Sequence, residues 1–118
     1  GEIEKGIDCY KKCLKASAQR QDLKKQGELL TAIGLNYVKL NRYKEAIVVQ
    51  ERAIEIYKEL GNSHEEGVGL ADLADSNAFV GNLKAAISFG RQAVELLKEK
   101  YRDEALRIQE SIADWEKR

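Results

Sequence analysis

The sequence predicts an all-α fold in which helical hairpins stack in a row, and three observations support this. The segment from Gly27 to Gly61 nearly reappears forty residues later, from Gly67 to Tyr101. The 118 residues contain no proline, which favours long and uninterrupted helices. Apolar residues recur at spacings of three and four, and no segment shows the two-residue alternation of a strand.

The internal repeat is clearest at small and apolar positions. Its matched pairs are Leu30 and Leu70, Ile33 and Leu73, Gly34 and Ala74, Ala46 and Ala86, Ile47 and Ile87, and Ala53 and Ala93. The second half of the segment also matches the N-terminus, where Cys13 stands in the place of Ala53. A three-fold match of this kind predicts an array of repeats.

We therefore expect one domain, residues 1–118, with about six helices. Residues 2–21 form the second helix of a partial repeat, residues 22–61 and 62–101 form two full repeats, and residues 102–117 form a capping helix. Because the sequence starts in the middle of a repeat and lacks an initiator Met, we expect it to be a fragment of a longer protein.

The N-terminal helix contains Cys9 and Cys13, which lie four residues apart and therefore on one face. Two such thiols are compatible with half of a metal site or with a redox pair. However, no second Cys or His pair completes a tetrahedral site, and His64 is the only histidine. We expect both thiols to be buried and structural.

The first full repeat has recognisable helix ends. Asp22 is suited to cap the first helix, and Asn41 to end it in the left-handed conformation. Gly61 closes the second helix, as Gly81 ends the first helix of the next repeat. Gly34 lies inside a helix, where glycine costs about 1 kcal/mol against alanine, so we expect a neighbouring helix to come close there.

The second full repeat and the last helix follow the same pattern. Asn62 or Ser63 caps the helix that begins this repeat. Gly67 and Gly69 do not belong to a phosphate-binding loop, because no Gly-Lys-Ser/Thr follows, and we expect them to allow close helix packing. The last helix carries one apolar stripe (Ala105, Ile108, Ile112 and Trp115) on an otherwise polar sequence, as a terminal repeat requires.

Composition excludes several classes of function. The formal net charge is zero, which argues against nucleic acid as the main partner. No apolar run approaches the roughly 18 residues of a membrane span. The charged N-terminus does not resemble a signal peptide, and the two cysteines do not form a disulfide framework. We expect an intracellular, cytoplasmic domain.

The pattern resembles the tetratricopeptide repeat (TPR) family, in the long variety found in cell-polarity and signalling adaptors and in some bacterial peptide-sensing regulators. Residues Leu30, Ile33, Gly34 and Tyr37 match its first helix, and Tyr43, Ala46, Ala53 and Ile54 match its turn and second helix. Asn77 replaces the tyrosine in the second copy, and the period is forty rather than thirty-four.

This resemblance implies a right-handed superhelix whose concave face, lined by the first helix of each hairpin, binds another protein. The groove residues that it implies are Glu28, Thr31, Leu35, Val38, Lys39, Val68, Ala71, Asp72, Asp75 and Phe79, with an extension by Ile108, Ser111 and Trp115. We expect Leu35, Val38, Val68 and Phe79 to be apolar side chains without an internal partner, which is typical of an interaction site.

The expected occupant of this groove is a helix or an extended segment of a partner protein, apolar with some basic residues. Glu28, Asp72 and Asp75 make the groove negative. Some relatives hold a C-terminal carboxylate with Lys and Asn side chains of the first helices, at positions that here carry Thr31, Leu35 and Asp72. These three residues cannot hold a carboxylate as cations would, so we do not expect that type of ligand.

Three other hypotheses remain open at this stage. An enzyme would need a nucleophile and a base, but no motif gives His64 such a partner, and we expect this histidine to be a surface residue in a capping turn. A homo-oligomer could form through the open flank of the N-terminal half repeat. A sensor would change shape when it binds a peptide. We expect no enzyme activity, no cofactor and no metal.

Overall fold

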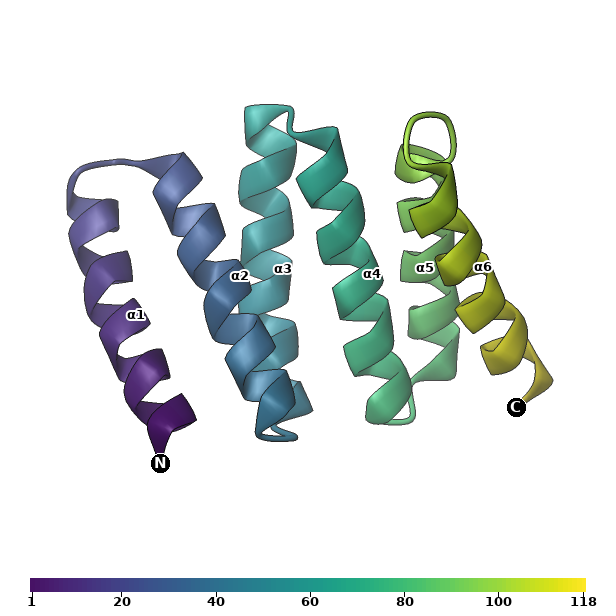
Figure 1. Ribbon diagram of the computed structural model, residues 1–118, viewed down its shortest axis with the longest axis horizontal. Helices are drawn as coiled ribbons and strands as arrows, with labels where there is room; N and C mark the ends of the chain where they lie inside the picture. The colour runs from purple at the N-terminus through teal and green to yellow at the C-terminus, as the bar shows by residue number, and fades with distance from the viewer.

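The structure is a computed structural model that describes all 118 residues, and it consists of six α-helices without a strand (Figure 1). The helices are α1 (Glu2–Gln19), α2 (Leu23–Lys39), α3 (Tyr43–Leu60), α4 (Ser63–Phe79), α5 (Leu83–Leu97) and α6 (Arg102–Lys117). The all-α prediction is confirmed, and each expected helix is present at the expected place in the chain.

The helices form a row in which each one packs mainly against the next along the chain. The row measures 42 × 32 × 20 Å, and α1 and α6 lie at its opposite ends (Figure 1). A closed bundle would instead bring the first and last helices together. The arrangement is therefore that of a repeat array, in which every unit buries its apolar face against its neighbours.

Short turns join the helices and follow the predicted local chemistry. Asn41, Gly61 and Gly81 have positive φ angles of 59°, 72° and 88°, so the chain reverses there in the left-handed conformation. The carboxylate of Asp22 accepts a hydrogen bond from the backbone N–H of Lys25 at 3.1 Å, which confirms the predicted N-cap of α2.

Helices approach closely where the sequence places glycine. A Cβ atom at Gly34 would lie 3.2 Å from Cγ of Gln50, and one at Gly67 would lie 2.8 Å from two side-chain carbons of Leu97. The expectation that Gly34 and Gly67 allow close packing is confirmed. At the other end of the row, Gly90 makes room for Ile112, because a Cβ there would lie 2.9 Å from that side chain.

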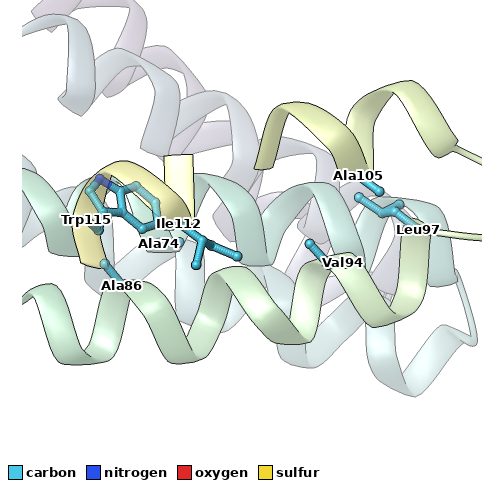
Figure 2. Packing of buried hydrophobic residues seen from close by; sticks show 7 residues of the cluster. All are labelled: Ala74, Ala86, Val94, Leu97, Ala105, Ile112 and Trp115. Carbon is cyan, nitrogen blue, oxygen red and sulfur yellow. The ribbon is translucent and has the colours of Figure 1, made fainter. Parts of the chain in front are cut away.

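The largest group of buried apolar side chains joins α4, α5 and α6. Figure 2 shows Trp115 and Ile112 of α6 close to Ala86 of α5 and Ala74 of α4. Trp115 is 7% exposed, whereas both alanines are completely buried. The large side chains of the last helix thus pack against the small residues of the repeat. This contact fixes where α6 lies relative to α4.

The prediction that Cys9 and Cys13 are buried is wrong, because both thiols are exposed. The residues that match Cys13 in the later repeats, Ala53 and Ala93, are 3% and 0% exposed. Each of these alanines is covered by the first helix of its own hairpin. Helix α1 packs on α2 and α3 through Ile7 and Leu14, and the two thiols lie outside these contacts.

Candidate functional site

A groove runs between α4 and α6 and consists of two connected hollows. The inner hollow, of about 280 Å³, reaches Val68 and Leu97. The outer hollow, of about 500 Å³, reaches Phe79. Both are lined by Asp75, Arg107, Ser111 and Trp115, which we call the waist of the groove. Because the two hollows share these four residues, a single bound segment can occupy both.

The groove follows from helical periodicity on two neighbouring helices. On α4, positions 68, 71, 75 and 79 repeat at intervals of three and four and therefore lie on one face. On α6, positions 104, 107, 111 and 115 do the same, and Arg118 follows directly after the helix. The intervening α5 contributes only Leu97, at the bottom of the inner hollow.

At its inner end, side chains from the first turns of α4 and α6 join across the groove. The ring Nε2 of His64 lies 3.0 Å from Oε1 of Glu104. The imidazole ring also packs on Tyr101, with 4.1 Å between ring centroids. His64 lies in the first turn of α4 with 35% of its side chain exposed, which agrees with the expectation of a surface residue at a helix start, and it also contacts Tyr101 and Glu104. Its position shows a structural contact between two helices rather than a pairing with a nucleophile.

At its outer end, the groove is bordered by an aromatic pair. Phe79 stacks on Tyr43 of α3 with 4.6 Å between ring centroids and 8° between ring planes. The expectation that Phe79 has no internal partner is therefore wrong. Stacking covers only one face of the ring, and Phe79 remains 66% exposed, so its other face is open to solvent beside the outer hollow.

Some charged side chains of the groove form ion pairs within the chain, and others do not. Within the chain, Glu104 pairs with His64, and Asp114 pairs with Arg118 at 2.8 Å. The side chains of Asp75, Glu110 and Arg107 line the groove but make no ion pair or side-chain hydrogen bond. Two unpaired carboxylates therefore face one unpaired guanidinium group, and the open part of the groove is negative.

Two neighbouring carboxylates on α4 have raised pKa values. Burial raises the pKa of Asp75 above its ordinary range. Burial, and then the charge of Asp75, raise the pKa of the half-buried Asp72 to about 6. Asp72 is half-buried and has no cation beside it, whereas the Asp75 side chain remains exposed to solvent within the groove.

The α4 residues that the sequence predicted for the groove lie at it or beside it. Val68 and Ala71 line the inner hollow, Asp75 lines both hollows, and Phe79 lines the outer one. Asp72 lies one turn before Asp75 on the same helix. The extension that was expected on α6, formed by Ile108, Ser111 and Trp115, also lines the groove.

The predicted residues of α2 line neither hollow. These residues are Glu28, Thr31, Leu35, Val38 and Lys39. Thr31 donates a hydrogen bond to the carbonyl oxygen of Gly27 at 2.9 Å. The expectation that Val38 lacks an internal partner is wrong, because it packs against the core that α1, α2 and α3 share. Leu35 is 47% exposed. A role of α2 in binding stays a prediction.

The sequence did not predict the charged residues at the α6 wall of the groove, or the apolar Leu97 that α5 contributes. The charged residues are Glu104, Arg107, Glu110, Asp114 and Arg118. The spacing of Arg107, Ser111 and Trp115 was a usable signal, because side chains four apart share a helix face. The repeat alignment did not reach α6, so no matched position pointed to them.

A sequence model of the tetratricopeptide repeat matches residues 26–99, from the first turn of α2 to the end of α5. A comparison with curated proteins gave no match. None of the six helices has the length and apolar character needed to cross a membrane. Repeats of this family generally mediate protein–protein interaction, and their fold is typically non-catalytic. The match covers more than half of the sequence and agrees with the observed hairpins, so the chain belongs to the tetratricopeptide repeat family.

Proposed function

We propose that this chain is a non-catalytic binding module that holds a helical or extended segment of a partner protein in the groove between α4 and α6. In a larger protein it would serve as an adaptor, a scaffold or a regulatory domain. The observation that carries this proposal is the continuous groove itself, which is open to solvent and is mainly apolar in its inner hollow. The family supports it, because its repeats generally bind other proteins.

The floor of the groove is suited to apolar side chains of a partner. Val68 and Ala71 of α4 face Ile108 and Trp115 of α6 across the inner hollow. Each large apolar side chain that such a floor buries contributes about 1.5–3 kcal/mol. Two or three such anchors contribute about 3–9 kcal/mol before the cost of association is subtracted, so we expect weak binding, with a Kd between high micromolar and millimolar.

A selection from a displayed library of random 12-residue peptides tests the proposal. We expect peptides with two or three large apolar residues to be enriched on the intact chain. Ser111→Arg should abolish their binding, because this half-buried serine lines both hollows and a long side chain fills the waist.

Ser88→Arg is the matched control, because Ser88 is an exposed serine on α5 outside the groove. It should leave binding unchanged. Both variants should keep the helical circular dichroism of the parent chain. Enrichment of peptides that bind both variants equally would place the interaction elsewhere on the surface and refute the proposed site.

A further inference from the structure

We propose that the waist of the groove binds the cationic head of one lysine or arginine side chain from the partner segment, with Asp75 as its counter-ion and the open face of Phe79 beside it. This inference rests on the proposed function, and it specifies one chemical feature of the partner. A segment with apolar residues on both sides of a single cation fits the two hollows and the waist together.

The positions of Asp75 and Phe79 on α4 bring a carboxylate and an aromatic face to the same place. The two residues are four apart, so their side chains are neighbours on one helix face. Both line the outer hollow. Tyr43 holds the Phe79 ring from behind, so the ring is already oriented before any ligand arrives. A cation placed here would be stabilised by the aromatic face through a cation–π interaction and by the carboxylate through an ion pair.

Charge complementarity favours a cation over an anion where the waist opens into the outer hollow, because Glu110 there adds a second carboxylate to Asp75 and Arg107 of the waist. The carboxylates of Glu104 and Asp114 already have partners within the chain, and so does the guanidinium group of Arg118. The unpaired groups that remain along the groove are Asp75 and Glu110 against Arg107. An anionic ligand would meet two uncompensated carboxylates, whereas a cationic ligand would pair with them.

The state of Asp75 in the free chain supports the same conclusion. Asp75 remains exposed to solvent, the groove walls raise its pKa by partial desolvation, and no cation of the chain pairs with it. Asp72, one turn away, adds a second carboxylate. Because Asp75 is exposed and unpaired, a ligand cation can reach it from solvent and pair with it. Arg107, on the opposite wall, is the only unpaired cation of the groove and would compete with the ligand.

Two blocked amino acids of matched length test this inference directly. Nα-acetyl-lysine methylamide and Nα-acetyl-norleucine methylamide share an aliphatic chain and differ by the ammonium group. Each is titrated into the ¹⁵N-labelled chain at pH 7.5 and followed by NMR. We expect the lysine compound to shift amide signals around Asp75, Phe79 and Ser111, and to bind about five- to tenfold more tightly than the norleucine compound.

Variants assign this preference to single side chains. Asp75→Asn should remove the preference for lysine, whereas Glu51→Gln, an exposed carboxylate of α3 outside the groove, should leave it unchanged. Arg107→Gln should strengthen lysine binding, because it removes the competing cation. Equal binding of the two compounds, or a lysine preference that survives Asp75→Asn, would overturn the inference.

The two proposals fail separately. If selected peptides occupy the groove but the lysine compound shows no advantage, the cation site is wrong and the proposed function stands. If the lysine compound binds at the waist but no peptide is selected, the proposed function is wrong and the cation site stands.

Discussion

Replacing Asp72 by asparagine should stabilise the fold at neutral pH. Burial, with a smaller contribution from the charge of Asp75, raises the pKa of Asp72 from 3.8 to about 6. A carboxyl group with a raised pKa binds its proton more tightly in the folded chain than in the unfolded chain. Stability is therefore lost as the pH rises from about 4 to about 6, and the full cost is present above that range.

The magnitude follows from the size of this shift. A difference of about two pKa units corresponds to about 3 kcal/mol, at 1.36 kcal/mol per unit. Asparagine must still bury a polar amide, so we expect a gain of about 1–3 kcal/mol in the free energy of unfolding at pH 7.5. For a chain of this length, each kilocalorie raises Tm by about 4 °C.

Urea unfolding, followed by circular dichroism at pH 4, 5, 6 and 7.5, measures this effect. The advantage of Asp72→Asn over the parent chain should grow between pH 4 and pH 6 and then level off. Glu55→Gln, an exposed position on α3, serves as the control and should change stability by less than about 0.5 kcal/mol at any pH. An Asp72→Asn variant that gains nothing at pH 7.5, or gains equally at pH 4, would refute the reasoning.

Three further changes probe the packing that builds the groove. Trp115→Ala removes a buried side chain and should cost about 3–5 kcal/mol in urea unfolding; a loss below about 1 kcal/mol would show that α6 is not held by this residue. A double-mutant cycle of Tyr43→Ala and Phe79→Ala should give a coupling free energy of about 0.5–1.5 kcal/mol, and additive losses would contradict the stacked pair. Gly67→Ala should destabilise the chain by about 1–3 kcal/mol, because its Cβ would meet Leu97 at 2.8 Å, whereas a gain would mean that the side chain simply moves aside.

The same residues that hold the helices together also shape the groove. Trp115 is part of the core between α5 and α6, and it also lines both hollows. His64 and Glu104 join the first turns of α4 and α6 at the inner end. A substitution of Trp115, or of the His64–Glu104 pair, therefore changes the distance between the groove walls as well as the stability of the fold. Binding experiments should use variants such as Ser111→Arg, whose side chain is outside the core.

Much of the fold could be predicted because local chemistry is repeated. Proline is absent, Asp22 caps α2, and Asn41, Gly61 and Gly81 take the left-handed conformation that ends a helix. Each of these features acts within a few residues, so it can be recognised without coordinates. The forty-residue spacing of small residues then requires the hairpins to nest, because only small side chains let helices come this close.

The candidate site could be predicted only in part, because the internal repeat ends before α6. Val68, Ala71, Asp75 and Phe79 lie at the groove because α4 belongs to a full repeat. The other wall of the groove belongs to α6. The packing of Trp115 and Ile112 against α5 determines which residues of α6 face α4. Tertiary packing also decided that Cys13 is exposed, whereas the matching residue Ala53 is buried against Leu30 of α2.

By itself, the sequence determined six helices, their ends and their order in a row, since each depends on residues that are near one another in the chain. The tertiary structure alone decided that the groove lies between α4 and α6, that Phe79 stacks on Tyr43, and that Asp75 remains unpaired. The physical reason is distance along the chain. Residues that lie more than thirty positions apart in the chain come into contact only when whole helices pack. A local sequence pattern does not predict how their side chains are then oriented.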